Sequence, residues 1–150
     1  MAGRWFDDWK VGDQIVHDLR RTVTETDNLL FSALSHNPQP LHLDAEYAAT
    51  TEFGGIVVNG TFTFALTVGL SVGDTTLGTL IANLGYDQVV MPKPVFIGDT
   101  LHVETEVTEL RASASRPGAG IVTFRHAAIN QRGEEVCRCL RSALIRRRPI

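Results

Sequence analysis

The sequence predicts an α+β fold, in which an antiparallel sheet wraps around one buried helix. Two observations support this fold class. Residues 101–107, 121–129 and 135–145 of the second half carry strand patterns, and a turn at residues 130–133 joins the last two. Residues 61–72 (TFTFALTVGLSV) are apolar on every side, which is typical of a helix buried on all faces.

The first half of the chain carries the signals of further helices. After a strand expected near residues 15–23, Thr24 is followed three residues later by Asp27, and this pair forms a capping box ahead of an apolar stripe. The helix should end near the prolines of residues 37–40, because proline lacks an amide donor and disfavours helical geometry in the residue before it.

The remaining elements follow from local signals. His42 is expected on a stiff loop after the prolines. A short helix is expected to follow, with Asp44 as its N-terminal cap. Residues 79–86 are expected to form a strand. The glycine- and serine-containing residues 113–120 connect two strands and predict a flexible hairpin loop.

The composition indicates a single globular domain spanning residues 1–150. The formal charge of -3 argues against a nucleic-acid binder, and no stretch reaches the roughly 18 apolar residues of a membrane span. The N-terminus does not resemble a signal peptide. Cys137 and Cys139 lie two apart in an expected strand, which disfavours a disulfide, and nothing around them suggests a zinc site. We therefore expect a cytoplasmic protein without a metal or a membrane contact.

His42 and Gly60 carry the strongest chemical signal. Histidine can accept and donate a proton near neutral pH, and His42 lies on the proline-stiffened loop between two leucines. Gly60 opens the apolar helix, where a missing side chain lets a ligand approach the backbone and unpaired amides carry partial positive charge. The alternatives are a structural histidine and a glycine kept for tight packing of the helix.

The sequence around His42 resembles the active-site block of a known family. Residues 37–44 (NPQPLHLD), residues 50–53 (TTEF) and the pair Asn59 and Gly60 are similar to MaoC-like (R)-specific enoyl-CoA hydratases. The resemblance implies a hot-dog fold and an enzyme that adds water to, or removes it from, an acyl-CoA thioester. It also implies that His42 acts as acid and base, and that the amide at Gly60 points at the thioester oxygen.

Asn37 departs from the family pattern. The resemblance implies an aspartate five residues before the histidine, but Asn37 cannot take up a proton at ordinary pH. Either His42 moves both protons while Asn37 orients the water, or a carboxylate elsewhere takes part. Asp44 and Asp27 are the candidates, although both have a structural explanation as helix-capping residues. His36 is a weaker candidate, since a helix end favours histidine by its dipole alone.

Other segments resemble the mesaconyl-CoA and itaconyl-CoA hydratase branch of this family. Residues 82–86 (ANLGY) and 115–122 (SRPGAGIV) are similar to that branch, whereas residues 92–101 (PKPVFIGDTL) are shared more widely. The branch implies a short branched or dicarboxylic acyl-CoA of the mesaconyl, itaconyl or methylmalyl type. A second carboxylate favours an arginine partner, and Arg116 and Arg111 are the candidates unless both are solvated hairpin residues. Lys93 is a candidate for the phosphates of CoA.

The resemblance also implies an assembly and leaves two other functions open. Hot-dog domains are expected to pair through edge strands as a homodimer or a dimer-based oligomer, which covers exposed sheet edges. CoA enters as part of the substrate, so no separate cofactor is expected. The alternatives are a thioesterase of the same fold, which would hydrolyse the thioester, and a non-catalytic acyl-CoA-binding subunit.

Overall fold

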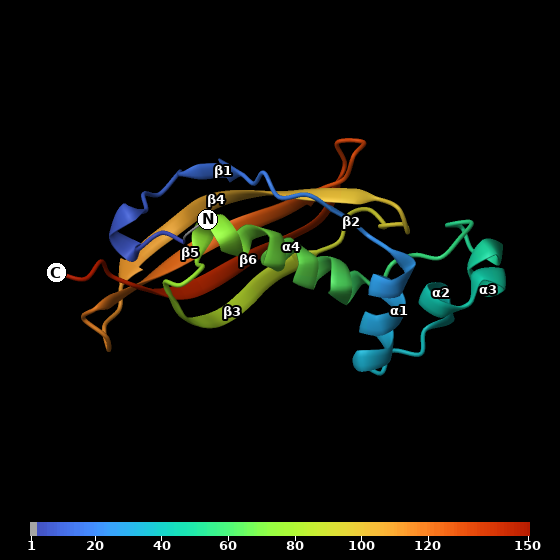
Figure 1. Ribbon diagram of the computed structural model, residues 1–150, viewed down its shortest axis with the longest axis horizontal. Helices are drawn as coiled ribbons and strands as arrows, with labels where there is room; N and C mark the ends of the chain where they lie inside the picture. The colour runs from blue at the N-terminus through green and yellow to red at the C-terminus, as the bar shows by residue number, and fades with distance from the viewer. Residues whose placement is uncertain (1–2) are drawn as a thin grey trace.

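An antiparallel sheet forms the body of the protein, and the computed structural model describes residues 3–150. The strands follow the order β1-β4-β5-β6-β3, and β2 pairs with a second part of β4 (Figure 1). Their bounds are β1 (Gln14–Val16), β2 (Arg21–Thr22), β3 (Leu80–Val90), β4 (Thr100–Ala112), β5 (Ala119–Ile129) and β6 (Glu135–Arg146). The strands expected in the second half and the turns between them are confirmed.

The N-terminal segment forms two short strands in place of the single strand expected near residues 15–23. A 3-10 helix, η1 (Phe6–Asp8), precedes them. Val16 pairs with Glu104 and Arg21 pairs with Leu101, so the chain between these two pairs is longer than the stretch of β4 opposite it. The extra residues must leave the ladder, which ends β1 and starts β2.

Helix α4 (Gly60–Thr75) lies along one face of the sheet (Figure 1). The expectation that it is buried on all faces was wrong for the single chain. Its buried residues are Thr63, Thr67, Leu70, Ser71 and Thr75, whereas Phe62, Phe64 and Leu66 are only partly buried. The hydroxyls of Thr67 and Thr75 donate to carbonyls one turn earlier at 2.7 Å. These hydroxyls are satisfied within the helix, so the small side chains can be buried, while Phe62, Phe64 and Leu66 pack against the edge of the core.

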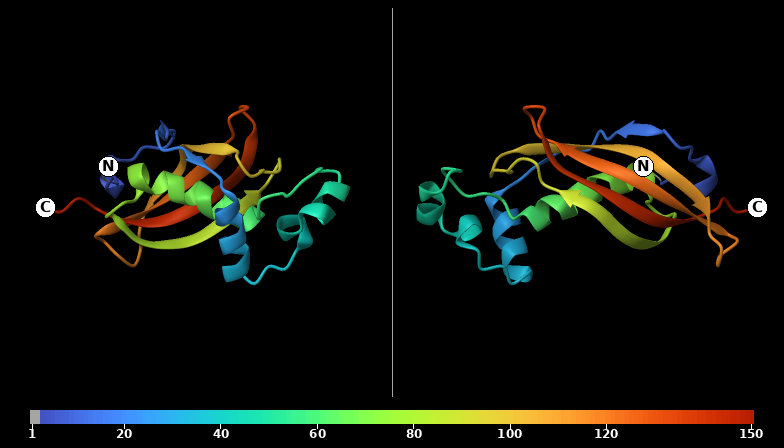
Figure 2. Two further views of the ribbon diagram at one scale, coloured as in Figure 1. Left: turned by 45° about the vertical axis from the view of Figure 1, so that its right-hand side comes forward. Right: turned by 180° about the vertical axis from the view of Figure 1, so that it is seen from behind.

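Three helices form a lobe beyond the N-terminal end of α4: α1 (Glu25–Leu34), α2 (Pro40–Leu43) and α3 (Ala45–Thr50) (Figures 1 and 2). The expected capping box of α1 is confirmed, because Thr24 Oγ1 accepts from the Asp27 amide and the Asp27 carboxylate accepts from the Thr24 amide. The buried residues of α1 are the polar Asn28 and Ser32, whereas Leu30 of the apolar stripe is 57% exposed.

His42 lies on the short helix α2 and not on a loop, which corrects the expectation from the proline-rich segment. Pro40 is the first residue of α2, where a helix needs no amide donor and the fixed φ of proline suits the first turn. Helix α3 confirms the short helix expected after Asp44. No helix within residues 3–150 has both the length and the hydrophobicity of a transmembrane segment.

A chain of buried polar side chains crosses the face of the sheet that carries α4. His17 Nδ1 contacts Asp74 Oδ2 at 2.9 Å, and His17 Nε2 contacts the hydroxyl of Thr105 at 2.8 Å. The same hydroxyl lies 2.8 Å from His126 Nδ1. Arg141 is fully buried nearby, and its charge acts on the titration of His126. Within this polar chain, burial lowers the pKa of His126, which makes this part of the core sensitive to pH.

Candidate active site

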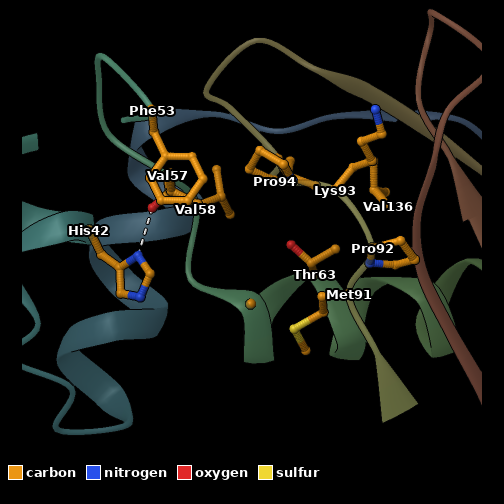
Figure 3. Close-up of a pocket in the computed structure, with 12 residues that line it drawn as sticks. His42, Phe53, Val57, Val58, Thr63, Met91, Pro92, Lys93, Pro94 and Val136 are labelled. Atoms are coloured by element: carbon orange, nitrogen blue, oxygen red, sulfur yellow. Dashed lines mark hydrogen bonds between the residues drawn. The ribbon is translucent and has the colours of Figure 1, made fainter. Parts of the chain in front are cut away.

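A pocket of about 360 Å³ opens at the N-terminal end of α4. It lies between the helical lobe and the segment that follows β3, and Figure 3 shows side chains from both reaching toward it. Most of its wall is apolar. The lining residues are His42, Phe53, Val57, Val58, Gly60, Thr63, Met91, Pro92, Lys93, Pro94, Val95 and Val136.

His42 enters this pocket with its ring held by the backbone. His42 Nδ1 lies 2.7 Å from the carbonyl oxygen of Val57, as the dashed line in Figure 3 shows. A carbonyl oxygen only accepts, so Nδ1 carries the proton and Nε2 of the neutral ring has a free lone pair. The amide of Val57 donates to the carbonyl of Leu41 at 3.2 Å, which fixes α2 to the same residue a second time. The arrangement suits a general base.

Gly60 lies on the same pocket as His42 and is the first residue of α4. The Asn59 side chain caps the helix by accepting from the amide of Thr61 at 3.0 Å. A Cβ atom on Gly60 would lie 2.6 Å from Sδ of Met91, so a larger residue would displace that side chain. The start of a 16-residue helix therefore faces the pocket with no side chain of its own at Gly60, and its dipole favours negative charge there.

Asn37 is not part of this pocket. Its Oδ1 accepts from the amide of Gln39 at 3.0 Å, which shapes the turn before α2. Asn37 lines a separate, open hollow of about 550 Å³ together with His36 and residues of α1. The structure therefore brings His42 and Gly60 together and leaves Asn37 and His36 on a neighbouring surface.

Asp27 and Asp44 both act as helix caps in the structure. Burial tends to raise the pKa of Asp27, but hydrogen bonds from Thr24 and the nearby charge of Arg21 outweigh it and hold this pKa below its usual value. Asp44 accepts from the amide of Tyr47 at 3.0 Å at the start of α3. Neither carboxylate lines the pocket of His42.

Arg116 lies far from His42 within one chain. It is an exposed residue of the hairpin between β4 and β5, and Figure 1 shows this hairpin at the end of the molecule opposite α2. The lysine that lines the pocket is Lys93, whose Nζ lies 3.5 Å from a carboxylate oxygen of Glu134. Among the described residues no group of three histidine, cysteine or acidic side chains is placed to hold a metal ion.

Comparison with known proteins identifies the family of this chain. A family model described as the MaoC like domain matches residues 8–128. The chain belongs to the MaoC-like family. It is similar to a mesaconyl-CoA hydratase from Cereibacter sphaeroides, with 35% identity over 147 residues, which cover 98% of this chain and 42% of the relative. The MaoC-like chain thus spans less than half the length of that hydratase.

Solved structures share the fold of this MaoC-like chain. A MaoC-like dehydratase from Rhodospirillum rubrum superposes with a TM-score of 0.85 and 36% identity, covering 99% of this chain and 100% of the other. A Mycobacterium tuberculosis protein with a double hot-dog fold superposes with a TM-score of 0.88 and 26% identity, covering 98% of this chain and 45% of the other. The expected hot-dog fold is confirmed.

Two residues of the MaoC-like chain at this site were not singled out from the sequence. Met91 reaches the pocket from the segment after β3, and its distance from Gly60 in the sequence hides that contact. Asn28 is buried and hydrogen-bonded to the backbone of His42 at 2.8 Å. An asparagine inside a predicted helix was the available signal, but the apolar residues beside it suggested a different inward face.

Proposed function

We propose that the protein is an acyl-CoA hydratase or dehydratase, which adds water to an enoyl-CoA thioester or removes it from the hydroxyacyl product. The observation that supports this proposal is the shared pocket of His42 and Gly60, which places a proton acceptor beside a helix N-terminus. Membership of the MaoC-like family and the similarity to a mesaconyl-CoA hydratase agree with this chemistry.

The proposed hydration uses His42 for both proton transfers. Nε2 of His42 removes a proton from water, and the water oxygen forms a bond to the β-carbon as the double bond opens. Negative charge moves to the thioester oxygen, where the amide at Gly60 and the dipole of α4 stabilise it. The protonated ring then returns its proton to the α-carbon. Dehydration follows the same steps in reverse, and the reaction needs no cofactor beyond the CoA of the substrate.

We propose a short, branched or dicarboxylic acyl group as the substrate class. The similarity to a mesaconyl-CoA hydratase supports it, and so does the modest pocket of about 360 Å³. Within one chain the cation beside the pocket is Lys93, which can meet either a distal carboxylate or a phosphate of CoA. Arg116 can take part only across a contact between two copies of the chain.

We propose that two such domains pair through β3. This strand is at the end of the sheet order, so one of its edges has no neighbour within the described chain. Leu84 and Val89 of β3 are 52% and 40% exposed. The double hot-dog fold of the similar M. tuberculosis protein agrees with pairing of two such units. We place this homodimer in the cytoplasm, where the buried thiols of Cys137 and Cys139 remain reduced.

A substrate panel tests the proposed function. Straight-chain, branched and dicarboxylic enoyl-CoAs are incubated with the protein, and both the loss of the conjugated thioester absorbance and the release of free CoA are followed. We expect hydration without CoA release, fastest on the dicarboxylic members. His42→Ala should lower turnover at least about a hundredfold in a folded protein.

The other outcomes identify the alternatives. Release of free CoA without hydration would show a thioesterase, and binding without any product would show a non-catalytic subunit. The activity of Arg116→Ala on the same substrates tests the role of this arginine. A loss confined to dicarboxylic substrates would place Arg116 at the distal carboxylate, whereas an equal loss on all substrates would assign it another role.

A further inference from the structure

Asn28 is a buried side chain that connects the two halves of the candidate site. It lies on α1 and is only 1% exposed. Its Nδ2 donates to the carbonyl oxygen of His42 at 2.8 Å, and its Oδ1 accepts from the backbone amide of Asn59 at 2.9 Å. One carboxamide therefore holds the backbone of the proposed base and the residue directly before Gly60.

The contact with Asn59 reaches the first turn of α4. Asn59 is itself 1% exposed, and its Oδ1 accepts from the amide of Thr61 at 3.0 Å. Its Nδ2 donates to Ser32 Oγ at 3.2 Å, one turn after Asn28 on α1. Two polar side chains of α1, Asn28 and Ser32, thus hold Asn59 at the start of α4. Of these two, Asn28 also bonds to His42.

We propose that Asn28 is a positioning residue for the reaction, which fixes the distance and orientation of the His42 ring relative to the helix amide at Gly60. The inference rests on the proposed function of that pocket. An asparagine suits the role because its carboxamide offers a donor and an acceptor on one rigid group. An ionised aspartate offers only acceptors, and a leucine of similar shape offers neither.

Helix α1 is anchored well enough to act as the reference for this bridge. The capping box of Thr24 and Asp27 fixes its start, and the ring of Phe31 packs edge-to-face on Phe62 of α4 with centroids 5.6 Å apart. Without Asn28, α2 keeps its two bonds to Val57 but loses its direct link to the start of α4. Small displacements of a catalytic group lower rates by up to about a hundredfold.

The test compares Asn28→Ala with the matched control Ser32→Ala. Both remove a buried polar side chain from the same face of α1 and from the same junction, but only the first removes the bond to His42. On the best substrate of the panel, we expect Asn28→Ala to lower kcat at least about tenfold with KM changed less than about threefold. Ser32→Ala should keep kcat within about threefold of wild type at a similar loss of thermal stability. Equal kcat values for the two variants would overturn the proposal.

A spectroscopic readout keeps the test independent of turnover. In ¹⁵N-histidine-labelled protein, the ring of His42 should show a protonated Nδ1 and a bare Nε2, and Asn28→Ala should shift or broaden these signals while Ser32→Ala leaves them in place. If Asn28→Ala does not fold, Asn28→Ser replaces it with the same expectations, because the shorter hydroxyl cannot span both contacts. An inactive wild type would contradict the proposed function, whereas unchanged His42 signals in a folded Asn28 variant would contradict the positioning role.

Discussion

At the scale of single residues, Gly60 and Met91 show how closely the pocket is built. The space that a Cβ on Gly60 would need is already occupied by Sδ of Met91, at 2.6 Å. The thioether is the flexible end of its side chain, so the fold can adapt by moving it. The resulting methyl group would nevertheless stand between an incoming thioester oxygen and the helix amides.

Gly60→Ala should therefore leave the protein folded and lower kcat by about a hundredfold, the typical loss for a disrupted oxyanion contact. The double variant Gly60→Ala with Met91→Ala separates two causes, because it removes the clash but keeps the methyl group. Steady-state kinetics of both variants and of Met91→Ala alone provide the measurement. Recovery of kcat in the double variant would show that displaced Met91, and not the methyl group, blocks the site.

At the scale of elements, the N-terminus of α1 supports the site although it lies outside the pocket. Thr24→Ala removes one half of the capping box while the Asp27 carboxylate remains. We expect the free energy of unfolding to fall by about 1 kcal/mol, the usual cost of losing such a cap. Urea titration measures it. An unchanged midpoint would show that tertiary contacts, and not the cap, hold this end of α1.

The same helices show what the sequence could predict and what it could not. The start of α1 was predictable because Thr24 and Asp27 satisfy each other locally. The buried faces of α1 and α4 were not, since Asn28 and Thr67 turn inward only because they find partners that lie elsewhere in the fold or one turn away. Proline occurs both just after the end of helices and at their first position. The prolines before His42 therefore predicted a loop, whereas Pro40 is the first residue of α2.

The candidate site also has a part that the sequence could predict and a part that it could not. His42 and Gly60 stood out because a histidine on a stiff segment and a glycine at a helix start have local signatures, and the structure places both on one pocket. The separation of Asn37 from that pocket depends on the turn before α2. The remoteness of Arg116 depends on the length of the β4–β5 hairpin. The residues next to Asn37 and Arg116 in the sequence do not show how far either side chain lies from the pocket.

At the scale of the whole molecule, burial makes stability depend on pH through His126. Burial, with the charges of Arg141 and His17 adding to it, lowers the pKa of His126 to about 3 from the ordinary 6.5. As pH falls below 6.5, the unfolded chain binds a proton at this ring and the folded protein does not. The free energy of unfolding should therefore decline on acidification, by up to about 1.4 kcal/mol per pH unit from this group.

His126→Gln should reduce that slope between about pH 6 and pH 4, because glutamine keeps a polar contact for Thr105 but binds no proton. Chemical unfolding at several pH values measures the effect. His102→Gln on β4 controls for the loss of one histidine. A slope that stays the same in His126→Gln would assign the acid sensitivity to carboxylates, of which Asp27 and Asp99 have lowered pKa values.

At the same scale, α1 and β3 carry apolar side chains that are exposed on the single chain. Patches of this kind on a single chain mark an interaction surface. Leu84→Asp on the free edge of β3 should convert the proposed dimer into a monomer, because a buried charge without a partner opposes association. Sedimentation velocity measures the change. Leu77→Asp, at a similarly exposed leucine outside the strands, should leave the dimer intact.

The pairing pattern of the sheet also has a consequence for the order of folding. Strands β4, β5 and β6 are joined by short hairpins, whereas β1 and β3 pair with strands far along the chain. Local pairs close with a smaller loss of chain entropy, so the three-stranded meander should form first. The segment that carries Asn28, His42 and Gly60 lies outside this meander and should be ordered after it. Its backbone amides should exchange with solvent through local openings that leave the meander protected, so the protein can lose its candidate site well before it loses its sheet.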